Sequence, residues 1–177
     1  LGQGLASTGI AVLCYDKRTM VYPEEFAADR GFTVKEEVVD DAVAAVGLLR
    51  ANAAIDPEGI YVLGHSLGGM VAPRVAASEP NIAGLILMAA SNEPLEDACL
   101  RQTEYLVGRD GTVGPEEQQH LELTKQQVAR AKDPALSAET PATELPLGTP
   151  ASYWLDLRTY DPLATVAGLG KRVLVLQ

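Results

Sequence analysis

A serine flanked by glycines, at the junction of an apolar run and a helix-like stretch, constrains the fold of this chain more than any other feature. Residues 60–69 read Ile-Tyr-Val-Leu-Gly-His-Ser-Leu-Gly-Gly, and residues 70–77 continue with an apolar, helix-forming pattern. A serine on such a sharp strand-to-helix turn takes a strained backbone conformation, and glycine two residues to either side lets the neighbouring chain pack closely. The spacing therefore predicts that the Ser66 hydroxyl projects into open space.

The segments on either side of Ser66 decide between two interpretations of the turn. In the first, Ser66 is a nucleophile, because the N–H groups and positive dipole end of the following helix suit a developing oxyanion. In the second, the serine only caps the helix. A strand before and a helix after form the context that marks a nucleophile elbow, so we predict that Ser66 is a nucleophile.

The composition is typical of an ordinary globular protein with one core and an insertion. The chain has 177 residues, of which 47% are hydrophobic and 21% are charged. Its formal charge of −10 disfavours nucleic acid and anionic membranes as partners, so we expect a small neutral ester or acyl substrate instead. No apolar stretch reaches the roughly 20 residues that span a bilayer. Because no Cys/His cluster has metal-ligand spacing, we expect no metal and no cofactor.

Four apolar runs predict the strands of a parallel sheet, at residues 9–15, 60–65, 82–89 and 172–177. Continuous apolar runs are typical of strands buried on both faces. We therefore expect Cys14, in the first run, to be a core residue, and we expect the same of Cys99 in a predicted helix. A capping box at residues 33–36 opens a further predicted helix, which ends near Asn52.

Strands that alternate with helices predict an α/β fold with a doubly wound, mainly parallel sheet. Reactive groups gather at the carboxyl ends of such strands, and Asp16, Ser66 and Ser91 are expected to share this edge. About eighty residues separate the third run from the fourth, more than a crossover needs, so we assign this span to a helical cap. The predicted domains are a core with the elbow at 1–91, the cap insertion at 92–152, and a return to the core with the last visible strand at 153–177.

The predicted cap contains two helices and an irregular segment. The helices are expected at 95–107 and 115–131 with a break at 108–111, and residues 138–150 are expected to be irregular. Residues 153–157 are then expected to lead the chain back to the sheet. Asp161 is predicted to cap a short helix that has Pro162 in its first turn.

Taken together, these segments resemble the α/β-hydrolase superfamily and look most similar to bacterial esterases of the dienelactone-hydrolase and serine-aminopeptidase-like branch. The resemblance rests on Tyr15-Asp16-Lys17-Arg18, Gly64-His65-Ser66-Leu67-Gly68-Gly69, Tyr153-Trp154-Leu155-Asp156-Leu157, Tyr160-Asp161-Pro162 and Val173-Leu174-Val175-Leu176-Gln177. It implies an enzyme whose serine attacks an acyl carbonyl, while a histidine takes the proton and an acid orients the histidine. By this resemblance, Ser66 matches the nucleophile and the backbone N–H of Leu67 matches one half of the oxyanion hole.

The resemblance also implies that the other catalytic positions lie outside this chain. In the family, the acid follows the strand that here begins at Arg172, the histidine follows one strand later, and the second oxyanion donor would precede Leu1. We therefore expect the chain to be the middle of a longer protein and to be inactive alone. His65, at the variable position of the elbow, and His120, on a polar helix, are not expected to replace the base.

Several further residues have a structural and a functional interpretation. Asp16 and Arg18 are expected to fix a loop through an ion pair or hydrogen bonds, and Asp40 with Asp41 to form a solvated helix face. Four residues are candidates for an acyl pocket, although such residues are found more often in cores and turns: His65, Asn92, Tyr105 and Trp154.

The sequence leaves three hypotheses open. The leading one is a serine hydrolase that cleaves a carboxylic ester through an acyl-enzyme on Ser66, with thioesterase, acyltransferase and peptidase as variants that share the elbow. The second is a non-catalytic binding or interaction protein with an α/β-hydrolase-like fold. The third is an association with another chain, such as a homo-oligomer, that completes the sheet and supplies the base.

Overall fold

The structure is a computed structural model that describes residues 2–28, 31–109 and 111–177. Leu1, and residue 110 within the predicted break at 108–111, lie outside the described residues. The chain divides into two compact units, the first formed by the described parts of 1–26, 35–91 and 161–177, and the second by those of 27–34 and 92–160. We describe each unit by itself, and the domain boundaries given above remain predictions.

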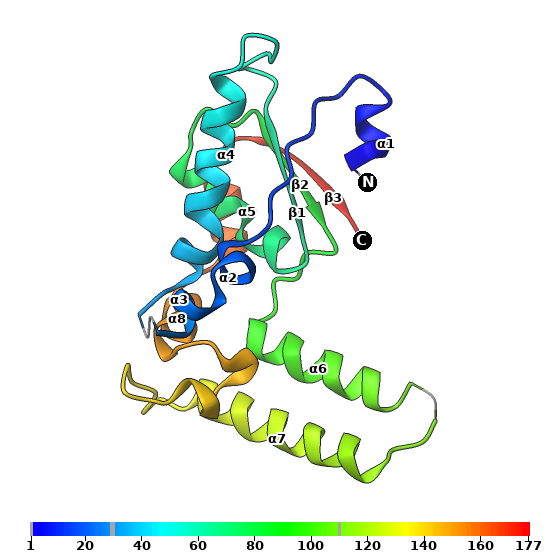
Figure 1. Ribbon diagram of the computed structural model, residues 1–177, viewed down its shortest axis with the longest axis vertical. Helices are drawn as coiled ribbons and strands as arrows, with labels where there is room; N and C mark the ends of the chain where they lie inside the picture. Colours follow the sequence, from blue (N-terminus) through cyan, green and yellow to red (C-terminus); the bar gives the residue numbers. More distant parts are fainter. Residues whose placement is uncertain (1, 29–30, 110) are drawn as a thin grey trace. The chain divides into compact units, whose positions relative to one another are not determined.

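The first unit is built on a parallel sheet of three strands in the order β1-β2-β3 (Figure 1). The strands are β1 Tyr61–His65, β2 Gly84–Met88 and β3 Arg172–Leu176. Their register aligns Tyr61 with Gly84 and Arg172, so that all three strands end level at their carboxyl ends. Parallel strands joined through helices confirm the predicted α/β class.

Helix α5, Leu67–Ser78, supplies the core of this unit because it packs against β1 and β2. Its side chains Val71 and Val75 are almost fully buried, as is Leu85 on the facing strand. Burial of such apolar side chains contributes about 1.5–3 kcal/mol each. The other helices of this unit include α1 Gly2–Ala6, α2 Arg18–Val21, α4 Asp40–Arg50 and α9 Pro162–Gly168, and α3 Pro23–Ala28 begins here.

The predicted strand at residues 9–15 is wrong. Gly9, at φ 86°, ends α1: its N–H bonds to the Ala6 carbonyl at 3.1 Å, and the Ile10 N–H bonds to the Leu5 carbonyl at 3.3 Å. This pair of bonds is a Schellman stop signal. Within the described residues, 10–16 pair with no strand, and Ile10 is 52% exposed. An apolar run forms a strand only where a neighbouring strand supplies hydrogen-bond partners, as it does for β1, β2 and β3 but not for this segment within the described residues.

Burial of the remaining strands is also lower than the apolar runs predict. All five residues of β3 are exposed, because α5 packs on β1 and β2 while β3 lies at the edge of the sheet. Cys14 is exposed rather than part of the core, since the segment that carries it is not in the sheet. Cys99, by contrast, is partly buried, and burial together with the Glu96 carboxylate raises the pKa of its thiol.

Helix α4 follows one turn of π-helix, Lys35–Val39, and ends at Arg50, two residues before the predicted end. Ion pairs join the start of α2 and the residue before it to α4 and to the π-helical turn. The Arg18 guanidinium binds Asp41 with two hydrogen bonds, one of them Nε to Oδ2 at 2.8 Å, and Lys17 Nζ lies 3.3 Å from Glu37 Oε1. The loop-fixing role predicted for Arg18 is confirmed.

Asp41 was expected to be solvated, and this was wrong, because it is partly buried and ion-paired. Asp16 is exposed and has no ion-pair partner among the described residues. The predicted cap of α9 is confirmed. The Asp161 carboxylate accepts a hydrogen bond from the Ala164 N–H at 2.9 Å, and Pro162 occupies the first turn.

The second unit contains a hairpin of two helices, α6 Leu95–Val107 and α7 Pro115–Lys132, which lie side by side (Figure 1). Their bounds agree with the predicted helices to within one residue. Two short 3-10 segments follow, Ala142–Glu144 and Pro146–Gly148, in the region predicted as irregular. Residues 153–157 belong to helix α8, Ala151–Arg158. None of the helices in the described residues is both long and apolar enough to cross a bilayer.

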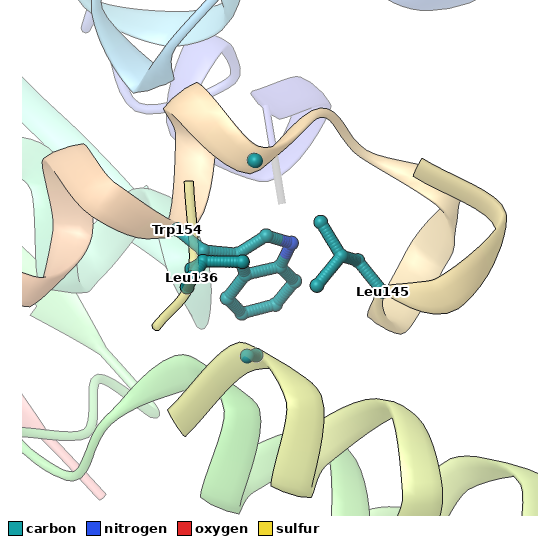
Figure 2. Packing of buried hydrophobic residues seen from close by; sticks show 5 residues of the cluster. Leu136, Leu145 and Trp154 are labelled. Carbon is teal, nitrogen blue, oxygen red and sulfur yellow. The ribbon is translucent and has the colours of Figure 1, made fainter. Parts of the chain in front are cut away.

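The core of this unit is a cluster around Trp154, whose indole lies between Leu136 and Leu145 (Figure 2). Ala131 and Ala151 complete the cluster, and Trp154 is only 2% exposed. Its Nε1 is buried and has no hydrogen-bond partner among the described residues. The indole therefore contributes through its apolar volume rather than through its N–H group.

The core cluster yields a stability prediction. Trp154→Ala should lower the free energy of unfolding by about 3–5 kcal/mol, because it leaves a large cavity. Trp154→Phe should lose less than half as much, because it keeps an aromatic ring and removes a donor that is already unpaired. Urea denaturation followed by circular dichroism measures both, since this is the only tryptophan and its fluorescence disappears in the variants. Equal losses would mean that the indole N–H has a partner.

The Arg18–Asp41 pair yields a pH prediction. The guanidinium holds the pKa of Asp41 below its ordinary value, so the pair stabilises the fold above the unfolded-state pKa of about 3.9, and this contribution disappears as the pH falls through the lower folded-state pKa. Asp41→Asn should therefore cost up to about 1 kcal/mol at pH 7 and nothing at the acid end.

Urea midpoints measured from pH 7 down to acid pH test this, with Asp16→Asn as the control that leaves the midpoint unchanged. A loss of the same size at every pH would show that the charge of Asp41 is irrelevant.

Candidate active site

The turn between β1 and α5 has the backbone conformation of a nucleophile elbow. β1 ends at His65, α5 begins at Leu67, and Ser66 alone makes the turn at φ 54° and ψ −119°. A left-handed φ costs an L-residue about 1–2 kcal/mol, so it persists only where the surrounding structure holds it. The Ser66 side chain is exposed and makes no capping hydrogen bond to α5. The interpretation of Ser66 as a mere helix cap therefore does not describe this turn.

Two glycines make the turn sterically feasible, and they are not the pair that the motif suggests. A Cβ added at Gly64 would lie 2.1 Å from the Gly68 carbonyl oxygen, and one at Gly69 would lie 2.7 Å from the Ala90 Cβ. A Cβ at Gly68 would meet nothing within 4 Å. The predicted close packing is confirmed, because Gly64 lies against the Gly68 backbone, but the predicted need for glycine holds at Gly64 and Gly69 and not at Gly68.

Backbone hydrogen bonds fix the elbow to the sheet. The Ser66 N–H bonds to the Met88 carbonyl at 2.9 Å, which continues the β1–β2 ladder by one residue, and its own carbonyl accepts the first bond of α5 from the Met70 N–H at 3.0 Å. As the first helical residue, Leu67 has an N–H without an intrahelical acceptor. This N–H and the positive end of the helix dipole can stabilise negative charge next to the serine.

The other predicted site residues fall in both units. His65 is exposed and belongs with Ser66 to the first unit, whereas Asn92, Tyr105 and Trp154 belong to the second. Tyr105 is 70% exposed on α6, and Trp154 is buried in the core cluster, which is the alternative weighed for it above. An acyl pocket formed by these residues therefore stays a prediction.

His120 is exposed on α7, as expected for a solvated helix histidine. Within the described residues, no group of three or more His, Cys, Asp or Glu side chains is placed to hold a metal ion.

The first unit also has an open groove of about 520 Å³ that sequence reasoning missed. It lies along the segment before α2 and the side of α4, and Tyr15, Arg18 and Asp41 line it. Burial in this groove and the nearby Asp41 carboxylate raise the pKa of the Tyr15 phenol. No residue of the elbow lines the groove. The groove therefore marks a different surface from the one that Ser66 presents.

The glycine geometry predicts opposite effects of two neighbouring substitutions. Gly64→Ala should lower the free energy of unfolding by about 3 kcal/mol or more, because the added methyl group overlaps backbone atoms that cannot move aside. Gly68→Ala should raise it by up to about 1 kcal/mol, because this residue lies in α5 and alanine favours a helix. Thermal and urea unfolding of the two variants test this. A severe loss for Gly68→Ala would overturn the assignment of the close approach to Gly64.

Comparisons with known proteins agree with this architecture. Residues 1–176 match the model of the Alpha/beta hydrolase family. The chain is 36% identical to Esterase EstD of Thermotoga maritima over 176 residues, which are 99% of this chain and 38% of EstD. It is also 39% identical to the GPI inositol-deacylase of Debaryomyces hansenii over 69 residues, 38% of this chain and 7% of that protein. The chain thus spans less than half the length of either curated relative.

The family model matches 176 of the 177 residues. The structure agrees with this match, because the first strand of the parallel sheet leads through a strained serine directly into a helix. On these grounds the chain belongs to the α/β-hydrolase family.

Proposed function

We propose that the protein containing this chain is a serine hydrolase that cleaves a carboxylic ester through an acyl-enzyme on Ser66. The observation that carries the proposal is the conformation of Ser66, which is strained, exposed and not used to cap α5. Strain of this kind persists where the surrounding structure maintains it and is found preferentially at functional sites. The names of both relatives, an esterase and a deacylase, describe removal of an acyl group and support the same reaction class.

The reaction follows from the groups at the elbow. Ser66 Oγ attacks the carbonyl carbon of the ester, and its proton passes to a base. The carbonyl oxygen becomes an oxyanion that accepts a hydrogen bond from the Leu67 N–H. The tetrahedral intermediate then expels the alcohol, which takes the proton from the base, and leaves an acyl-serine. Water, activated by the same base, releases the carboxylic acid and restores the Ser66 hydroxyl.

The base is the part of this mechanism that the described residues supply least well. A serine hydroxyl is a weak nucleophile at neutral pH unless a positioned base accepts its proton. The sequence has two histidines. His65 ends β1, where successive side chains point to opposite faces, and His120 is exposed on α7 of the second unit. We therefore propose that the histidine and its orienting acid come from a part of the protein beyond these 177 residues.

The net charge of the chain supports a neutral substrate. A formal charge of −10 repels anions over a surface of this size, so phosphate-bearing and polyanionic substrates are disfavoured. A small uncharged ester meets no such barrier. The proposed substrate class is accordingly a neutral carboxylic ester.

A fluorophosphonate probe tests the assignment of Ser66. The natural protein that contains this chain should gain one probe adduct on the peptide carrying Ser66, and Ser66→Ala should abolish the adduct and reduce hydrolysis of p-nitrophenyl acetate by at least about a thousandfold. Ser78→Ala, which changes an exposed serine at the other end of α5, is the matched control and should label like the wild type. The 177-residue chain alone should label slowly or not at all.

A folded natural protein that gains no adduct, with no ester hydrolysis, would overturn the proposal. That result would favour the non-catalytic alternative, in which the elbow is kept for its structure. Labelling of a residue other than Ser66 would overturn the assignment of the nucleophile but not the reaction class.

A further inference from the structure

A second strained turn follows β2 and lies directly beside the elbow. The Ala89 N–H bonds to the Leu176 carbonyl at 2.8 Å, one residue beyond the β2–β3 ladder, and Ala89 itself adopts φ 46°. This turn is linked to the elbow by a single residue, because the Met88 carbonyl accepts the bond from the Ser66 N–H. Met88 therefore connects Ala89 to the backbone of Ser66 through one peptide bond and one hydrogen bond.

Ala90, the next residue, is in close contact with the first turn of α5. A Cβ built on Gly69 would lie 2.7 Å from the Ala90 Cβ and 3.3 Å from its Cα. The position of Ala90 thus limits how far the start of α5, including Leu67, can move toward the sheet edge. The turn at Ala89–Ala90 acts as a support for the elbow.

One side chain binds this turn directly. Gln177 Nε2 donates a hydrogen bond of 3.0 Å to the Ala90 carbonyl oxygen. The loss of such a bond changes a local equilibrium by up to about tenfold, the same order as the penalty of the left-handed conformation at Ala89. The bond is exposed to solvent, so its loss would barely change global stability, yet it is large enough to shift the local equilibrium of a strained turn.

We propose that Gln177 is a positioning residue for the nucleophile: its amide fixes the Ala89–Ala90 turn against Gly69 and thereby holds Ser66 and the Leu67 N–H in register for attack. The inference rests on the function proposed for Ser66. Gln177 acts through the turn and touches neither the serine nor the ester. Gln177 affects how Ser66 Oγ and the Leu67 N–H are aligned with the ester, and small displacements of such groups lower the reaction rate.

Two substitutions isolate the donated hydrogen bond. Gln177→Glu keeps the shape of the side chain but, when ionised, has no proton to donate to the Ala90 carbonyl. Gln177→Lys restores a donor of similar reach. The natural protein carrying each change is assayed for its rate of fluorophosphonate labelling at Ser66, for kcat and KM with p-nitrophenyl acetate, and for its melting temperature.

We expect Gln177→Glu to slow both labelling and kcat by about three- to tenfold while KM changes by less than about twofold. Gln177→Lys should recover most of the lost rate, and the melting temperatures should stay within about 3 °C of one another. Hydrogen exchange provides a readout that needs no catalysis: the Ser66 amide, bonded to Met88, should exchange faster in Gln177→Glu than in the wild type.

The positioning role would be overturned if Gln177→Glu had the same labelling rate, kcat and amide exchange as the wild type. It would also be overturned if Gln177→Lys labelled and turned over as slowly as Gln177→Glu, because the hydrogen-bond donor would then be irrelevant. These outcomes differ from failure of the proposed function, in which the wild-type protein itself gains no adduct at Ser66. In that case the positioning role falls with it.

Discussion

The contact between the backbones at Gly64 and Gly68 is the constraint on which the rest of the first unit depends. β1 and α5 are separated by one residue, so the chain must change direction within Ser66, and the last part of the strand then lies against the first turn of the helix. There is room for no side chain at Gly64, where a Cβ would lie 2.1 Å from a carbonyl oxygen. That single geometric requirement puts the amino end of α5 at the carboxyl edge of the sheet, with the serine hydroxyl facing outward.

The strain at the elbow is offset by burial further along the same helix. Val71, Ala72, Val75 and Ala76 are all almost fully buried, so much of the apolar contact that holds α5 on the sheet lies beyond its first turn. Apolar burial of this kind is not directional and tolerates a strained start, whereas the serine needs a definite orientation. The division of roles explains why α5 is apolar to this degree while its first turn contains two glycines, Gly68 and Gly69.

Local signals made several features predictable from sequence. The Gly-x-Ser-x-Gly spacing gave the elbow, and the Asp161-Pro162 pair gave the start of α9, because each depends on residues within a few positions. The prediction of a strand at residues 9–15 was wrong, because strand pairing depends on a partner far away in sequence and not on apolar composition alone. Gly69 was missed for a similar reason: its close neighbour, Ala90, is reached only through the folded sheet.

Strain by itself does not mark the candidate site, as the three non-glycine residues with positive φ in the described chain show. Leu147 is one of them, and it lies exposed in a short 3-10 segment of the second unit, next to Gly148, where a surface turn accounts for it. Ser66 and Ala89 differ because one hydrogen-bonded residue, Met88, connects them at the ends of neighbouring strands. Backbone hydrogen bonds to the sheet hold both strained residues beside a helix amino end, and donors that are preorganised at the point where an oxyanion would form are what the proposed acyl transfer requires.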